Sequence, residues 1–256
     1  MCYVILSRIV CIGQLLLLTF NPCNIYCNEE AKAEALSIKR RALNLQFDKW
    51  NQNQCNTFKI SSLNAQSLSK HFEDLQDDHF LQQSDILCVN ETWLMSDLNA
   101  DLQGYTSYFL NKRSKGIALF TKIVPQNVHK LHTETMSLIV AQYKLFDVLS
   151  VYRYSESTQI EEFTQQVVEN VDLKKPTIIL GDINIDLFKH ENNVFSRELK
   201  NLGFVQLVKQ ATHLSGGLLD HIYVYIPLDG CCQLFKVHPL YYSDHDAVCC
   251  ILEFPC

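Results

Sequence analysis

The sequence predicts an α/β fold in which two mixed, mainly antiparallel sheets pack on each other and are flanked by helices. Short β-rich runs alternate with amphipathic helical segments, and several of these runs follow one another through turn residues, as in antiparallel meanders. The chain has 256 residues, of which 47% are hydrophobic and 20% charged, which is enough to bury the core of one large domain.

The expected elements follow one another from about residue 57 onward. Strands are expected where apolar and β-branched residues run together between turn residues, at 58–64, 85–90, 105–110, 116–122, 137–144, 147–153, 177–180, 220–225, 233–237 and 247–254. Helices are expected where apolar residues recur on one face, at 67–83, 160–173 and 192–202. We therefore place the folded domain at residues 57–256.

Residues 1–56 are expected to form an extension. Within residues 1–28, the segment from Val4 to Phe20 is nearly all apolar, like the hydrophobic part of a signal peptide, but Arg8 and Gln14 interrupt it. A cleaved signal or anchor and an ordinary apolar segment are equally compatible with this pattern, and a membrane is expected as a partner only if the segment is retained. Residues 29–56 are expected to form a helix followed by a polar linker.

Cysteine spacing and charge narrow the class of protein. The 11 cysteines are scattered without a CxxC pair, so a structural zinc site is not expected. Cys88, Cys249 and Cys250 lie in apolar strand-like runs and are expected to be core residues in a reducing compartment. The formal net charge of −6 argues against a protein that coats DNA by bulk electrostatics, but an enzyme with a locally basic cleft remains compatible with it.

Two polar clusters follow the first strands of the domain. Asn64 ends the strand at 58–64, and Glu91 comes directly after the apolar run at 86–89. A carboxylate at a strand end can bind a hard cation, and a neighbouring amide oxygen can serve as a neutral ligand, which suits Mg²⁺. Either cluster alone is more typical of a solvated strand end than of a metal site.

Two further clusters follow later strands. Asp182 and Asn184 come after the run at 177–180, and alternation along an extended segment would place both side chains on one face. His245 follows Asp244 just before the last strand, and a histidine there can exchange a proton near neutral pH if a carboxylate fixes its tautomer. Asp220, at the start of another strand, is the candidate for that carboxylate.

The order of these clusters resembles that of the endonuclease/exonuclease/phosphatase superfamily, over residues 58–254. The matching positions are Asn64, Glu91, Tyr152, Asp182, Asn184, Asp220, Asp244 and His245. The segments 63–68 and 85–94 resemble the endonuclease domains of LINE-type retrotransposons and other mobile elements. This resemblance implies a four-layer α/β sandwich with the site at one end.

The resemblance also implies a metal site. Glu91 would hold Mg²⁺, or Mn²⁺ in its place, with help from Asn64, and Asp244 would support the metal or the surrounding network. Gln66 stands where many members carry an acid, which weakens the case for a second metal.

The remaining roles concern the phosphate. Asp182 would activate the attacking water, Asn184 and Tyr152 would position the scissile phosphate, and His245 would contact it with its ring oriented by Asp220. The resemblance leaves open whether Asp182 or His245 is the general base.

The leading hypothesis is therefore a Mg²⁺-dependent endonuclease that nicks a DNA backbone in the nucleus. RNA is an alternative substrate, and a secreted or membrane-anchored protein is the alternative if residues 1–28 act as a signal. Two other hypotheses keep the same fold: an enzyme acting on RNA, inositol phosphates or lipid head groups, and a catalytically silent binding module.

Overall fold

The computed structural model describes residues 57–95, 100–113, 115–227 and 232–254. The apolar segment predicted at 1–28 and the helix and linker predicted at 29–56 lie outside these residues. No helix in the described part of the chain combines the length and apolar character needed to cross a membrane.

Twelve strands form two six-stranded sheets, in the orders β11-β12-β1-β2-β4-β3 and β5-β6-β7-β8-β10-β9. The strands of the first sheet are β1 (Thr57–Asn64), β2 (Ile86–Asn90), β3 (Thr106–Leu110), β4 (Ile117–Thr121), β11 (Cys232–His238) and β12 (Ala247–Glu253). Those of the second are β5 (Asn127–His132), β6 (Met136–Gln142), β7 (Asp147–Arg153), β8 (Thr177–Asp182), β9 (Val205–Gln206) and β10 (Asp220–Tyr225). Among the described pairs, β1–β2 and β7–β8 are parallel and the others are antiparallel.

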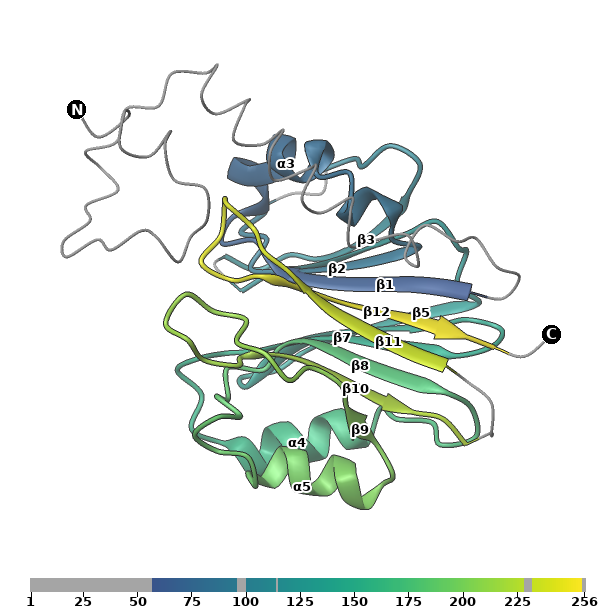
Figure 1. The fold of residues 1–256 in the computed structure, drawn as a ribbon, viewed down its shortest axis with the longest axis vertical. Coiled ribbons are helices and arrows are strands. Elements are labelled where there is room, and N and C mark those ends of the chain that lie inside the picture. The colour runs from purple at the N-terminus through teal and green to yellow at the C-terminus, as the bar shows by residue number, and fades with distance from the viewer. Residues whose placement is uncertain (1–56, 96–99, 114, 228–231, 255–256) are drawn as a thin grey trace, which may run out of the picture. The chain divides into compact units, whose positions relative to one another are not determined.

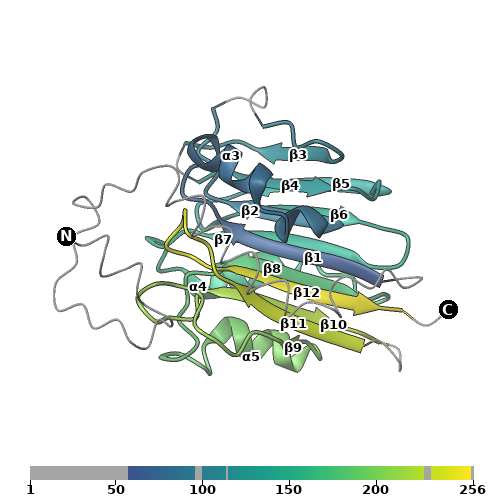
Figure 2. The same cartoon turned by 45° about the horizontal axis from the view of Figure 1, so that its top comes forward.

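Helices cover the outer faces of the two sheets. The helix α3 (Leu68–Asp77) and the 3₁₀ turn η3 (Leu81–Gln83) lie over the first sheet, and α4 (Ile160–Val168) and α5 (Val194–Asn201) lie over the second (Figure 1). The two sheets are stacked between these helices, and the same layers are visible after rotation (Figure 2). The predicted four-layer α/β sandwich with two mixed, mainly antiparallel sheets is confirmed.

Two apolar clusters hold the layers together. Between the sheets, fully buried side chains such as Ile60, Cys88 and Ile178 pack against each other. Between the second sheet and its helices, Phe163 of α4 and Phe195 of α5 pack with ring centroids 4.9 Å apart. Each large apolar side chain removed from water in this way contributes roughly 1.5–3 kcal/mol, so these clusters hold the polar strand ends in place.

Several element boundaries differ from the predictions. The helix predicted at 67–83 is divided, because the side chain of Asp78 accepts hydrogen bonds from the backbone amides of Phe80 and Leu81 and ends α3 before them. The helix predicted at 160–173 already ends at Val168. The strands β5 and β9 were not predicted, and most positions of β5 are exposed, so its residues show little apolar alternation.

Cys88, Cys249 and Cys250 are buried, as the sequence predicted. Cys88 lies in β2, and Cys249 and Cys250 lie in β12. Burial raises the pKa of the Cys88 and Cys249 thiols to about 12. These two groups therefore stay neutral near physiological pH and serve as packing residues.

Candidate active site

Strand ends from both sheets bring the predicted polar residues together. In the first sheet, parallel pairing of β1 with β2 sets Asn64 beside Asn90, one residue before Glu91. In the second sheet, antiparallel pairing of β8 with β10 sets Asp182 directly opposite Asp220. The register of both sheets thus gathers residues that lie far apart in the sequence.

Asn64 links the two sheets through its side-chain amide. Its Nδ2 donates to Glu91 Oε1 at 2.8 Å and to Asp182 Oδ2 at 2.9 Å. The Tyr152 hydroxyl donates to the same Glu91 oxygen at 2.9 Å. Burial, followed by the charges of Glu91 and Asp182, raises the pKa of Tyr152 far above its ordinary value, so the hydroxyl remains a donor.

Asn90 makes a second link between the sheets, to which sequence reasoning gave no role. Its Oδ1 accepts a hydrogen bond from the backbone amide of Asp182 at 2.9 Å, and its Nδ2 donates to the carbonyl of Val151 at 3.3 Å. Gly181 permits this approach, because its φ is +140° and a Cβ there would lie 1.9 Å from the Val151 oxygen. Asn90 therefore positions the backbone that bears Asp182.

Asn184 reaches Asp182 by a route that differs from the prediction. Strand β8 ends at Asp182, and Asn184 has a φ of +53°, so the two are not alternate residues of one extended segment. Its backbone amide donates to Asp182 Oδ1 at 3.0 Å, and its Nδ2 donates to Asp182 Oδ2 at 3.2 Å and to the Arg153 carbonyl at 2.8 Å. A local turn closed on the carboxylate thus replaces the expected alternation.

Asp182 is fully buried at the centre of this network. Burial, followed by the charge of Asp220, raises its pKa to about 7, while His245 and the amides of Asn64 and Asn184 favour its charged form. A carboxyl group with this pKa can both release and accept a proton near neutral pH, which is what general-base catalysis needs.

His245 is paired with Asp220, as the resemblance implied. Its Nδ1 lies 2.8 Å from Asp220 Oδ2, and both side chains are almost completely buried. Burial opposes the charged ring, but the charge and hydrogen bond of Asp220, followed by Asp182 and Asp244, raise its pKa to about 10. Carboxylate oxygens of Asp182 and Asp220 and a ring nitrogen of His245 all lie within 4.8 Å of one another. The ring is therefore a cation at neutral pH.

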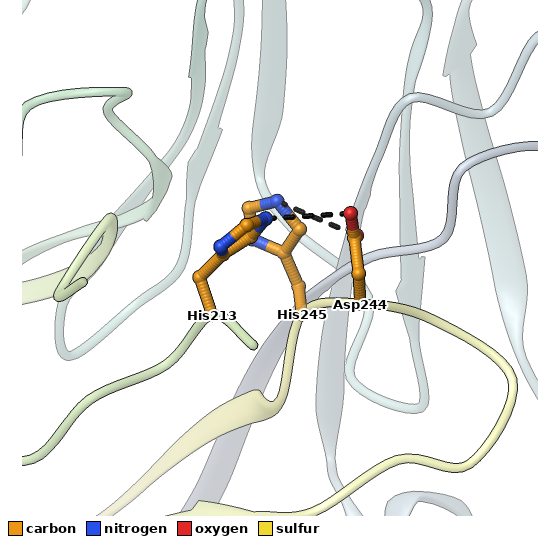
Figure 3. Close-up of side chains that lie close together, drawn as sticks. All are labelled: His213, Asp244 and His245. Atoms are coloured by element: carbon orange, nitrogen blue, oxygen red, sulfur yellow. Dashed lines mark ion pairs between the residues drawn. The ribbon is translucent and has the colours of Figure 1, made fainter. Parts of the chain in front are cut away.

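Two neighbouring imidazole rings, those of His213 and His245, face the carboxylate of Asp244 from the same side (Figure 3). Its Oδ2 is 3.3 Å from His213 Nε2, and its Oδ1 is 3.8 Å from His245 Nε2. Sequence reasoning missed His213, because it belongs to a loop rather than to the end of an apolar strand. The predicted ligand Asp244 thus contacts histidines, whereas the predicted ligands Glu91 and Asn64 contact each other.

Two hydroxyl groups to which the sequence analysis assigned no role support the site. Thr212 Oγ1 accepts hydrogen bonds from the backbone amides of Leu219 and Asp220, both at 3.0 Å. Ser243 Oγ donates to the Asn64 carbonyl at 2.7 Å and accepts from the His245 amide at 3.1 Å. Both residues therefore fix the backbone on which Asp220 and His245 stand.

The donor set fits a divalent cation. Glu91 offers carboxylate oxygens, which are the hard donors that Mg²⁺ and Mn²⁺ accept. Asn64 turns its amide nitrogen toward Glu91, and its amide oxygen accepts a hydrogen bond from the Gln66 backbone amide at 3.1 Å. Oδ1 of Asp220 and Oδ1 of Asp244 are buried oxygens with no hydrogen-bond partner among the described residues. The site therefore has carboxylate oxygens whose negative charge a cation would balance.

A basic rim borders the site on the side of Glu91. The loop that contains Lys112 and Lys115 is joined to the segment after Glu91 by a hydrogen bond from the Thr92 amide to the Gly116 carbonyl, 3.0 Å long. The two ammonium groups lie 5.4 and 4.3 Å from the centroid of the Tyr154 ring. Cations over an aromatic ring at this edge form a surface suited to a polyanion.

A groove adjoins the site at Asn184. It has a volume of about 980 Å³, and its lining includes Arg153, Asn184, Phe188, Lys189 and His190. Phe188 is 56% exposed, so part of its ring is open to solvent at the groove. The groove thus combines cationic side chains with an exposed aromatic ring beside Asn184.

This chain is similar in sequence to known proteins. The sequence profile of the Endonuclease/Exonuclease/phosphatase family matches residues 44–245. The chain is 30% identical over 173 residues to Recombination repair protein 1 of Drosophila melanogaster, covering 56% of this chain and 25% of that protein. It therefore spans a quarter of that relative's length.

Two solved structures resemble the described domain. A 3′-5′ exonuclease from Neisseria meningitidis has a TM-score of 0.63 at 20% identity, covering 77% of this chain and all of that one. The endonuclease domain of TRAS1, a telomere-specific non-LTR retrotransposon, has a TM-score of 0.56 at 15% identity, covering 77% of this chain and 98% of that one. Since the family profile spans most of the sequence, this chain belongs to the Endonuclease/Exonuclease/phosphatase family.

Proposed function

We propose that this protein is an endonuclease of mobile-element type that hydrolyses phosphodiester bonds in DNA with the help of a divalent cation. One observation carries the proposal: the buried carboxylate of Asp182 faces the Asp220–His245 pair, with all three groups within 4.8 Å. A carboxylate that can take a proton and an imidazolium that can donate one are thereby held close together, as acid–base catalysis of phosphodiester hydrolysis requires.

Geometry divides the roles of the two central groups. His245 Nδ1 is occupied by Asp220, which leaves Nε2 as the atom that can donate to a phosphate oxygen. Asp182 is a carboxylate, and it takes the proton of the attacking water. The pKa values of about 7 for Asp182 and about 10 for His245 support the same division.

Neutral donors complete the surroundings of the phosphate. The Tyr152 hydroxyl and the Asn184 amide are already oriented by Glu91, Asp182 and the Arg153 carbonyl. Donors held before the substrate arrives need little reorganisation as negative charge builds on the phosphate. Mg²⁺ or Mn²⁺ held by Glu91 and Asn64, with Asp244 as a further candidate, would neutralise part of that charge.

DNA is the substrate that the surroundings favour. Lys112 and Lys115 near Glu91, and Arg153 and Lys189 in the groove at Asn184, are cations that could contact a phosphate backbone, although Lys115 pairs with Glu156 and Lys189 with Asp186. The exposed ring of Phe188 can stack on a base. The similarity to a recombination repair protein supports DNA as the target, and the mobile-element type is proposed from the segments 63–68 and 85–94, with the retrotransposon endonuclease domain sharing the fold.

The proposal is tested by incubating the protein with supercoiled plasmid and Mg²⁺. Nicking is expected for the wild type, and losses of roughly 100-fold or more are expected for Asp182→Asn and His245→Ala, because each removes a group that exchanges a proton. His129→Ala, an exposed residue of β5, is the matched control and retains activity. A wild type that does not nick, or nicking that survives both active-site changes, contradicts the proposal.

The substrate class is tested with a panel under the same conditions. An intact duplex, an abasic duplex, a single-stranded RNA and an inositol phosphate are compared with the plasmid. Turnover of DNA well above the others supports the proposal. Preferential turnover of RNA or inositol phosphate keeps the reaction and rejects the substrate, whereas DNA binding without any turnover indicates a silent module.

A further inference from the structure

His213 and His245 stand side by side because two loops pair as a short antiparallel ladder. The Leu214 amide donates to the Asp244 carbonyl at 2.9 Å, and the Asp246 amide donates to the Thr212 carbonyl at 2.7 Å. These bonds flank the His213–His245 pair, and in this type of pair the two side chains emerge close together on one face. The ring centroids are accordingly 4.7 Å apart.

The loop around His213 also fixes which of its nitrogens carries the proton. The Ser215 backbone amide donates to His213 Nδ1 at 3.0 Å, and the Ser215 hydroxyl lies 2.7 Å from the same atom. Because Nδ1 accepts, the neutral ring carries its hydrogen on Nε2, the atom that faces Asp244. His213 is thus set as a hydrogen-bond donor rather than as a metal ligand.

Asp244 is the acceptor on which both rings converge, and it is loosely held. Its side chain is 34% exposed, compared with 22% for His213 and 6% for His245. It contacts His213 at 3.3 Å, its distance to His245 of 3.8 Å is beyond a hydrogen bond, and its Oδ1 has no such bond among the described residues. A carboxylate bound this weakly can be displaced by a stronger anion.

We infer that His213 is a further phosphate-contacting residue, whose Nε2–H binds a non-bridging oxygen of the DNA phosphate next to the oxygen bound by His245. The inference rests on the proposed function for the identity of the anion. In the free protein the Asp244 carboxylate is the acceptor that His213 Nε2 faces. When DNA binds, the phosphate oxygen replaces Asp244 as that acceptor.

Binding of a short DNA duplex in EDTA, followed by fluorescence anisotropy, tests this without turnover. His213→Asn keeps an acceptor for the Ser215 amide but has no donor at the Nε2 position, whereas His213→Gln keeps a donor near that position. We expect His213→Asn to weaken binding by roughly 10-fold or more and His213→Gln to restore most of it, because a hydrogen bond to a charged group is lost and regained. Asp244→Asn should tighten binding, since it removes the competing charge. His129→Asn is the matched histidine control.

A double-mutant cycle separates direct contact from an effect through Asp244. If His213 touches the phosphate, His213→Asn weakens binding in the Asp244→Asn background as well. Binding equal to wild type in His213→Asn, or an effect that vanishes once Asp244 is changed, overturns the inference. Thermal unfolding checks that each variant is folded. A wild type that binds with this pattern but never nicks plasmid rejects the proposed function and leaves the His213 contact standing.

Discussion

Acid should destabilise this protein through His221, a buried histidine beside the site. His221 lies in β10 directly after Asp220 and is fully buried. Its Nε2 donates to the carbonyls of Ile185 and Leu218, at 3.0 and 3.3 Å, and so joins the segment after β8 to the segment before β10. Burial lowers its pKa to about 4, although both carbonyls and the charge of Asp220 favour the protonated ring.

The sign and size of the effect follow from that shift. The unfolded chain binds a proton at His221 below its ordinary pKa of 6.5, while the folded protein does so only near 4, so stability is lost as the pH falls between these values. Lowering the pKa of His221 from 6.5 to about 4 corresponds to a loss of about 3 kcal/mol of stability once the pH is below both values. At pH 5 the loss is about 2 kcal/mol. Asp182 acts oppositely, because its folded pKa of about 7 exceeds its ordinary 3.8 and protonation stabilises the fold.

Because these two effects overlap, the measurement compares variants rather than following one protein. Urea unfolding at about pH 7.5 and about pH 5 gives the free energy of unfolding for wild type, His221→Gln and the exposed control His129→Gln. The stability advantage of wild type over His221→Gln should shrink by about 2 kcal/mol at the lower pH, while that over His129→Gln stays constant. An advantage of His221 that does not change with pH refutes the reasoning.

Three further predictions concern the backbone, the rim and the metal. Gly181→Ala should lower the free energy of unfolding by more than about 2 kcal/mol, because its Cβ would overlap the Val151 carbonyl. Gly104→Ala has open space around it and should lower that free energy by about 1–2 kcal/mol from its positive φ alone. Equal losses for the two variants in urea unfolding would contradict this prediction. Lys112→Ala with Lys115→Ala should raise KM for DNA, leave kcat nearly unchanged and flatten the salt dependence of binding; an unchanged salt slope would place DNA elsewhere. EDTA should abolish nicking and Mg²⁺ or Mn²⁺ should restore it; full activity in EDTA would exclude a metal role.

Strands could be predicted where apolar residues run together. They could not be predicted where only pairing with a distant segment makes the chain a strand. The strand expected at 147–153 is β7 with the same bounds, because each of its residues is buried. In β5 the apolar Val128 and Leu131 stand among polar residues, and pairing with β6 at the edge of the sheet makes this segment a strand. Likewise, a local side-chain cap at Asp78, not a change in apolar period, ends α3.

The site shows the same division. Glu91 and Asp182 were found because each follows a run of apolar strand residues, and Asn64 because it ends a predicted strand, which are visible signals in one sequence. His213 comes near His245 only through the pairing of two loops, and the bond from Asn90 to Asp182 depends on how the two sheets pack. Contacts of this kind leave no periodic pattern, so no local reading of the chain could have placed them.

Several residues at the site have strained backbone conformations, which the two packed sheets hold in place. The non-glycine residues with positive φ in the described chain all lie next to site positions: Gln66, Ser67, Glu91, Trp93 and Asn184. Each such conformation costs on the order of 1 kcal/mol or more and persists only where neighbouring contacts impose it. Here the amides of Ala65, Ser67 and Leu68 donate to successive carbonyls from Asn90 to Thr92, at 2.8–3.0 Å, so the loops after β1 and β2 hold each other in place. The strain is therefore sustained by the packed sheets behind the loops, and a core substitution that loosens either sheet should disturb Glu91 and Asn64 before it unfolds the domain.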